Sequence, residues 1–195
     1  MQKCEHLPSF LLRVVRRALL SIVCVKREEG VTTISADSAL CTEESRKSVP
    51  GFKLFEVDGW IFGFVGMAEV PTLFKLFIRD YKIESEDFTA VDMTELIINF
   101  ADFMKEIRPE YDANHGAMLM AKRDKVFVSE GLSVIEVKDT YAIGSGSEVA
   151  NVMLSLGAST YDAVDKACET NIWCYWPIET YTLGETTEHT ISGRK

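Results

Sequence analysis

The segment Trp60–Gly66 constrains the fold most strongly, because its side chains are apolar nearly throughout. A half-buried strand alternates apolar and polar residues, whereas an unbroken apolar run is typical of a strand that is buried on both faces. Two amphipathic helices are predicted directly after this strand. The first begins near Pro71, and the second runs from about Met93 to Ile107 before Pro109 ends it. The run therefore predicts a sheet that is covered by a second layer.

The rest of the chain alternates in the same way between strands and pairs of helices. An opening hairpin is predicted from β-rich runs at 21–26 and 31–37, which flank a turn that ends on Gly30. The other predicted strands are 53–57, 117–121, 125–128, 133–137, 140–143 and 178–183.

Two further helices are predicted in the C-terminal part. One covers about 148–156 and is stopped by Gly157, and the other covers about 161–172, where Ser159 and Asp162 are spaced as a capping box. The order is therefore strands, two helices, strands, two helices, strand. It predicts a four-layer α/β/β/α sandwich of the α+β class, in which two antiparallel sheets are flanked by helix pairs.

One folded domain is expected between two ends of different character. A length of 195 residues fits one domain with a sizeable core, and the strand and helix pattern assigns it to 21–183. Residues 1–20 are basic and amphipathic and predict a leader. Three explanations of it stay open: a removable propeptide, a docking or membrane-surface helix, and a start codon assigned too early. Residues 184–195 are polar and predict a flexible tail.

Charge and cysteine content exclude several kinds of function. The net charge of -9 disfavours a nucleic-acid partner and an anionic membrane, and no apolar run reaches membrane-spanning length. An odd number of cysteines without a secretory signal favours a reducing, cytoplasmic compartment. Cys168 and Cys174 are too widely spaced for a zinc-ligand pair and the histidines are scattered, so neither a metal nor another cofactor is predicted.

Five residues stand out by their joint placement on these elements. They are Ser21 at the head of the first strand, Asp37 at the end of the second, Lys53 at the start of the next, Gly66 at the end of the apolar run, and Ser145 within a Gly-Ser-Gly before a helix. With this order of elements, the chain resembles the proteasome β-subunit and HslV-type peptidase family from about residue 21 to 183. The resemblance implies the N-terminal-nucleophile hydrolase fold.

The same resemblance implies a complete catalytic set. A hydroxyl is a weak nucleophile, but Ser21 as the first residue would carry an α-amine whose ordinary pKa of roughly 7.7–8.0 suits a general base. Lys53 would lower that pKa by like-charge repulsion, and Asp37 would keep Lys53 charged and oriented. A backbone N–H near Gly66 would face the oxyanion, and Ser145 would support the catalytic terminus.

Three departures from the family pattern bear on activity. Ser21 stands where Thr is usual, and Leu20 precedes it where self-processing members have Gly. The family pattern Asp-x-x-Ser-Gly-Gly appears here as the segment Asn171–Trp176. In that segment Asn171 lacks the carboxylate, and aromatic residues replace the glycines.

Each candidate also has a purely structural interpretation. Ser21 could be an ordinary strand residue, Asp37 a turn cap, and Lys53 a solvated charge at a strand end. Ser145 could simply cap the helix that follows it. Outside the set there remain Cys4 as a nucleophile without a base, Cys24 and Cys174 as core residues, and Trp173 and Trp176 as packing residues near a subunit contact or the rim of the site.

The first hypothesis is a proteasome-like peptidase that hydrolyses peptide bonds through Ser21 once residues 1–20 are absent or removed. The alternatives are a non-catalytic proteasome-like subunit or assembly protein, and a small-molecule amidase of the same superfamily. By resemblance, the partners would be a polypeptide substrate, further copies of the chain in a ring, and a regulatory ATPase. A short chain of this kind is also similar to proteasome-like proteins of bacteriophages and prophages.

Overall fold

The computed structural model describes residues 21–41, 46–83 and 87–193. The expected leader, residues 1–20, lies outside this described part, as do the last two residues of the expected tail. Among the described residues, the chain forms two five-stranded sheets, one two-stranded sheet and four α-helices. None of these helices is both long and apolar enough to cross a membrane.

Both large sheets are antiparallel throughout. The first sheet has the order β10-β1-β2-β11-β12, and the second has the order β5-β6-β7-β8-β9. The strands of the first sheet are β1 (Val23–Glu28), β2 (Val31–Asp37), β10 (Thr140–Ile143), β11 (Ile178–Leu183) and β12 (Thr187–Ser192). Those of the second are β5 (Leu54–Val57), β6 (Trp60–Gly66), β7 (Gly116–Lys122), β8 (Lys125–Glu130) and β9 (Ser133–Glu136). The small sheet joins β3 (Ala39–Cys41) to β4 (Arg46–Ser48).

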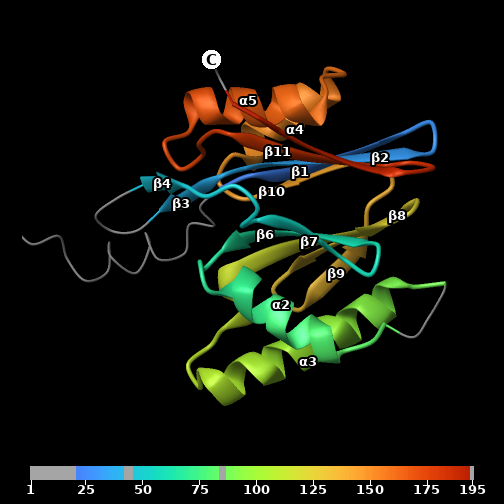
Figure 1. Cartoon of the computed structure of the whole chain (residues 1–195), viewed down its shortest axis with the longest axis vertical. Helices are drawn as coiled ribbons and strands as arrows, with labels where there is room; N and C mark the ends of the chain where they lie inside the picture. The colour runs from blue at the N-terminus through green and yellow to red at the C-terminus, as the bar shows by residue number, and fades with distance from the viewer. Residues whose placement is uncertain (1–20, 42–45, 84–86, 194–195) are drawn as a thin grey trace, which may run out of the picture.

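Two helices cover the outer face of each large sheet, so the molecule has four layers (Figure 1). The helices α2 (Val70–Asp80) and α3 (Ala90–Ile107) lie on the second sheet, and a short 3₁₀ turn, η1 (Ala113–His115), leads from α3 to β7. The helices α4 (Ser147–Ser155) and α5 (Thr160–Thr170) lie on the first. This arrangement confirms the predicted α/β/β/α sandwich.

Three apolar clusters fill the spaces between the layers, and β6 contributes to two of them. Phe62 and Phe64 lie in the cluster beneath α2 and α3, with their ring centroids 4.8 and 5.1 Å from that of Phe74. Ile61 and Val65 lie in the core between the two sheets. The apolar run is therefore buried on both faces, as its composition predicts, and each such side chain stabilises the fold by about 1.5–3 kcal/mol.

The start of α3 is set by a capping box that the apolar periodicity does not reveal. Asp92 accepts a hydrogen bond from the backbone N–H of Thr89 at 2.7 Å, and Thr89 Oγ1 accepts one from the backbone N–H of Asp92. The helix therefore begins at Ala90 instead of near Met93.

The predicted cap of α5 is confirmed, but its predicted end is not. Ser159 Oγ accepts a hydrogen bond from the backbone N–H of Asp162 at 3.1 Å, and the helix starts directly after it. It ends at Thr170 and not at Ile172, because the backbone of Asn171 is already extended.

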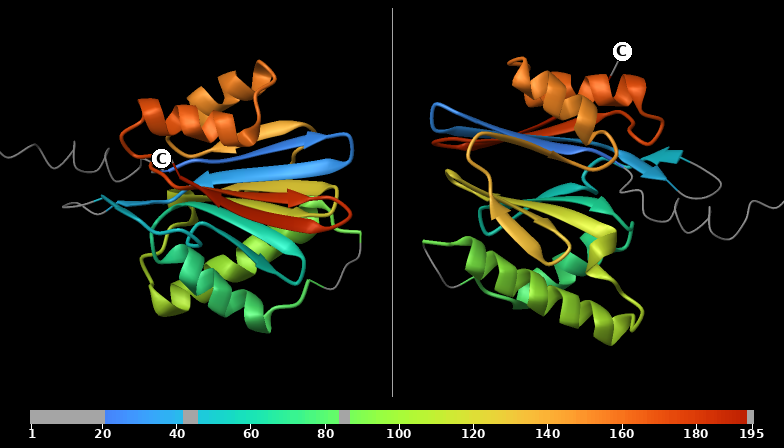
Figure 2. Two further views of the ribbon diagram at one scale, coloured as in Figure 1. Left: turned by 45° about the horizontal axis from the view of Figure 1, so that its top comes forward. Right: turned by 180° about the vertical axis from the view of Figure 1, so that it is seen from behind.

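The C-terminal segment differs from the flexible tail that its polar sequence predicts. Residues 187–192 form β12, which pairs antiparallel with β11 at the edge of the first sheet (Figure 2). All residues of β12 are exposed, so the strand has no burial pattern that a sequence could reveal. Backbone pairing with the open edge of β11 holds it, together with the ring of His189, which stacks on Tyr181 at 4.2 Å between centroids.

Candidate active site

Ser21 lies just before β1 and is buried, with 5% of its surface exposed. Its backbone has a φ of 106°, in the left-handed region that non-glycine residues rarely adopt. Its carbonyl oxygen accepts two hydrogen bonds, from Ser145 Oγ at 3.3 Å and from the backbone N–H of Gly146 at 3.2 Å. The head of β1 is therefore fixed by the Gly-Ser-Gly segment, which lies more than a hundred residues later in the chain.

Gly144 is required by the close approach of this segment to Ser21. It has a φ of 101°, and a Cβ at this position would lie 2.3 Å from the carbonyl oxygen of Ser21. The helix-cap interpretation of Ser145 is wrong, since the N-cap of α4 is Gly146 and no side chain makes a capping bond there. The Ser145 hydroxyl is directed instead to Ser21.

Asp37 and Lys53 form a buried ion pair, with Lys53 Nζ 2.6 Å from Asp37 Oδ1. Asp37 is 0% exposed and Lys53 is 4% exposed, so the interpretation of Lys53 as a solvated charge is wrong. A buried ion pair is tolerated only where further hydrogen bonds satisfy the carboxylate. Asp37 meets this condition, because it accepts three backbone N–H groups at 3.0 Å, from Ile22, Ala39 and Tyr175.

These bonds show that Asp37 has a structural and an electrostatic role together. The bond to Ala39 is the turn cap that one interpretation of the sequence predicts. The bond to Ile22 ties the carboxylate to the residue next to Ser21. Asp37 therefore joins the ends of β1 and β2 to the cation on Lys53.

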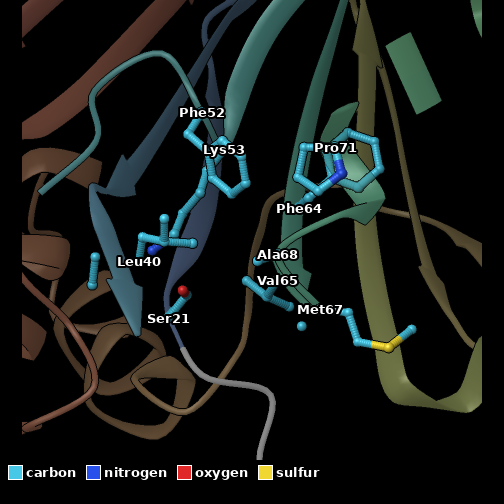
Figure 3. Close-up of a pocket in the computed structure, with 11 residues that line it drawn as sticks. Ser21, Leu40, Phe52, Lys53, Phe64, Val65, Met67, Ala68 and Pro71 are labelled. Carbon is cyan, nitrogen blue, oxygen red and sulfur yellow. The ribbon is translucent and has the colours of Figure 1, made fainter. Parts of the chain in front are cut away.

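Ser21 and Lys53 line one pocket, and the side chain of Lys53 extends towards Ser21 (Figure 3). Gly66, at the end of β6, lines the same pocket and has a φ of 120°. The structure thus brings together all five of the residues selected from the sequence: Ser21, Lys53 and Gly66 around the pocket, Asp37 on Lys53, and Ser145 on Ser21. The other lining side chains are apolar: Ala39, Leu40, Phe52, Phe64, Val65, Met67, Ala68 and Pro71.

Asn171 contacts the site, although from the sequence it stands out only as a departure from the family pattern. Its side-chain Nδ2 donates a hydrogen bond to the carbonyl of Ser145 at 2.7 Å, and its Oδ1 accepts one from the backbone N–H of Trp173 at 2.9 Å. One partner is an acceptor and the other a donor, which fixes the orientation of the amide. Asn171 therefore fixes the Gly-Ser-Gly segment, which in turn binds the carbonyl of Ser21.

Substitution of Asn171 by Asp, the residue usual in the family pattern, is predicted to weaken the site. A carboxylate can still accept the hydrogen bond from the backbone N–H of Trp173, but it has no donor for the carbonyl of Ser145, so two oxygen atoms would face each other. The free energy of unfolding is therefore expected to fall by about 1–3 kcal/mol at neutral pH. Urea unfolding at pH 7 measures the loss. Asn171→Ala is the matched control, since it removes both bonds without adding a charge. If Asn171→Asp is as stable as the parent chain, the amide has no special role.

Cys24, Cys174 and Trp176 are packing residues, whereas packing by Trp173 stays a prediction. Cys24 and Cys174 are fully buried, as expected of core residues, and burial raises the pKa of Cys24 to about 12. Trp176 packs on the cluster under α4 and α5 and donates its indole N–H to Asp165 at 2.7 Å. Cys4 lies outside the described residues. Among the described residues, no group of three or more His, Cys, Asp and Glu side chains is arranged to hold a metal ion.

Comparison with known proteins finds similarity in structure only. No protein-family model and no curated protein matches the sequence. The structure of BPH from Thiobacillus denitrificans, a bacterial proteasome homologue, aligns with a TM-score of 0.71 at 19% identity, covering 85% of this chain and 98% of that chain. The same protein in complex with epoxomicin aligns with a TM-score of 0.70 at 19% identity, covering 85% and 99%. HslV from Trypanosoma brucei aligns with a TM-score of 0.62 at 14% identity, covering 84% and 99%.

Proposed function

We propose that this chain, which has the fold shared by the proteasome homologue BPH and HslV, is a peptidase whose nucleophile is Ser21. The observation that carries the proposal is the arrangement around Ser21. Its carbonyl is fixed by Ser145 and Gly146, and Lys53, which is paired with the buried Asp37, lines the same pocket. A nucleophile, a cation and an orienting carboxylate are the groups that hydrolysis by an N-terminal residue needs.

In the proposed reaction, residue 21 begins the chain and its α-amine is neutral. The amine takes the hydroxyl proton while Ser21 Oγ attacks the peptide carbonyl, and the backbone N–H groups at the Gly66 end of the pocket stabilise the oxyanion. The C–N bond then breaks, the leaving amine takes the proton back from the α-ammonium, and an ester to Ser21 remains. Water, deprotonated by the same amine, hydrolyses the ester and frees the hydroxyl.

Lys53 serves this reaction by its charge. A cation in the same pocket raises the energy of the α-ammonium form and so lowers the pKa of the amine towards neutral pH. Asp37 holds the cation in place and prevents it from leaving the buried site. Lys53 therefore tunes the base and does not itself react.

The substrate and the partners follow from the same proposal. We expect an unfolded polypeptide as substrate and a homo-oligomeric ring that encloses the sites, with a regulatory ATPase as a further partner. Epoxomicin, which is bound in one structure of BPH, is the first inhibitor to test on this pocket.

The decisive test compares two proteins that differ by one residue. One begins at Ser21, released from a cleavable fusion, and the other begins at Leu20. Only the first has its α-amine on the nucleophile, so its hydrolysis of fluorogenic peptides is expected to be about 10²–10⁴-fold faster. Mass spectrometry of both proteins checks their first residue.

The other outcomes of this test are also informative. Equal rates contradict the α-amine as the base, even though a peptidase remains. If neither protein cleaves peptides but the first cleaves small acyl amides, the chain is an amidase of the same fold. No hydrolysis of either substrate class supports a non-catalytic subunit.

A further inference from the structure

Glu179 is a second buried carboxylate near the site, and the proposed reaction does not use it. It lies on β11, beside Ala36 of β2, and only 1% of its surface is exposed. Its Oε1 accepts a short hydrogen bond from the backbone N–H of Gly51. Gly51 lies two positions before Lys53 and has a φ of 75°. The carboxylate therefore binds the loop that leads into Lys53, the partner of Asp37.

Other ionisable groups surround this carboxylate. His189 of β12 approaches it at 3.8 Å from Nε2 to Oε1. Lys75 of α2 donates a hydrogen bond to the carbonyl of Gly51 at 3.4 Å, and its ammonium lies 4.3 Å from the ring centroid of Phe55. Lys53, Lys75 and His189 all act electrostatically on Glu179, and Glu179 in turn acts on Tyr181. The Lys53 loop is thus held from one side by β11 and from the other by α2.

Burial at this position is unfavourable for stability. It raises the pKa of Glu179 above its ordinary value of 4.5, although the bond from Gly51 and the nearby cations act in the opposite direction. Because burial disfavours the charged form, stability from this group is present below pH 4.5 and is lost as the pH rises through the raised pKa. A residue that costs stability at neutral pH and lies behind a reactive site is a candidate for a functional role.

We propose that Glu179 is a positioning residue, which orients Lys53 in the pocket of Ser21 by fixing the backbone of Gly51. This inference rests on the proposed peptidase function. The link is covalent and short, because Gly51 and Lys53 are separated only by Phe52, which also lines the pocket. A shift in this loop moves the ammonium of Lys53 relative to both Asp37 and Ser21.

Two variants separate the geometry from the charge of Glu179. Glu179→Gln keeps an oxygen for the N–H of Gly51 and removes the charge, whereas Glu179→Leu removes both at similar volume. We expect Glu179→Leu to lower kcat by about 10–100-fold with little change in KM, since a small misplacement of a catalytic group has an effect of this size. Glu179→Gln is expected to lose less. Glu188→Gln, the same change at an exposed position of β12, is the matched control and keeps the parent kcat.

Stability distinguishes positioning from a merely structural role. At pH 8 Glu179→Gln is expected to melt at or above the temperature of the parent chain, and its advantage grows between pH 4.5 and pH 8 because only the parent must ionise a buried carboxylate. A structural role alone predicts that activity and melting temperature fall together. The proposal is overturned if Glu179→Leu keeps the kcat of the parent chain, or if its loss of kcat is matched by an equal loss of folded protein.

A second readout does not depend on turnover. In protein labelled with ¹⁵N and with ¹³C-lysine, the amide resonance of Gly51 and the side-chain resonance of Lys53 are expected to shift together in Glu179→Leu and to stay fixed in Glu188→Gln. If Gly51 shifts and Lys53 does not, the loop is not coupled to Lys53 and the inference fails. This result stands whether or not the parent chain cleaves peptides, so failure of the positioning role is separate from failure of the proposed function.

Discussion

Replacing Ser21 by Ala, in the chain that begins at residue 21, is expected to lower peptide hydrolysis by at least roughly 10⁴-fold. The variant loses the only atom that forms the acyl bond, while the contacts that fix the head of β1 remain. Those contacts use the carbonyl of residue 21, which accepts from Ser145 and Gly146 and is unchanged by the substitution. Stability is therefore expected to change by no more than about 1 kcal/mol.

The measurement is kcat/KM on a fluorogenic peptide, with thermal unfolding of the same samples. Ser38→Ala is the matched control, because it also deletes a buried hydroxyl. Among the described residues, Ser38 Oγ is a buried side-chain atom without a hydrogen-bond partner, so its removal is expected to leave both rate and stability close to the parent. A Ser21→Ala protein that retains more than a tenth of the parent rate would remove Ser21 from the reaction.

Replacing Lys53 by Met is expected to lower activity at neutral pH and also to destabilise the fold. The substitution leaves the carboxylate of Asp37 buried without a cation, which costs about 3–5 kcal/mol. Hydrolysis falls because the cation that lowers the pKa of the Ser21 amine is gone. Urea unfolding measures the loss of stability. The pH–rate profile measures the change in the pKa of the amine, and its acid limb is expected to move to higher pH.

A double variant separates these two effects. In Lys53→Met with Asp37→Asn, no unpaired charge is buried, so part of the lost stability is expected to return. The recovery is partial, because Asp37 accepts hydrogen bonds from three backbone N–H groups and the amide nitrogen of Asn, itself a donor, would face one of them. Activity does not return, since the cation is still absent. Recovery of hydrolysis in the double variant would contradict the role given to Lys53.

The elements that bury apolar side chains were predictable from the sequence. The run Trp60–Gly66 and the periodic helices after it occur as β6, α2 and α3, because hydrophobic spacing and burial are directly linked. The joint placement of Ser21, Asp37 and Lys53 was also accessible, since all three lie at the ends of early strands. What these residues do in solution remains a prediction.

Other contacts could not be predicted, for two physical reasons. Asn171 contacts Ser145, more than twenty positions away in the chain, and Tyr175 contacts Asp37, more than a hundred positions away. No local sequence pattern encodes such contacts. The strand β12 is exposed on every residue, so it carries no apolar alternation, and its pairing comes from the backbone of β11. Its polar residues therefore predict a flexible tail.

The interior position of β1 in its sheet has a consequence for biosynthesis. β1 lies between β2, its neighbour along the chain, and β10, which ends at Ile143. The carbonyl of Ser21 is bound by residues 145 and 146, and Asp37 is bound by the N–H of Tyr175. Before residue 145 is added, the carbonyl of Ser21 lacks both of these partners, and before residue 175 is added, Asp37 lacks one of its bonds. A cut before Ser21 that depends on these contacts would therefore follow the synthesis of nearly the whole chain.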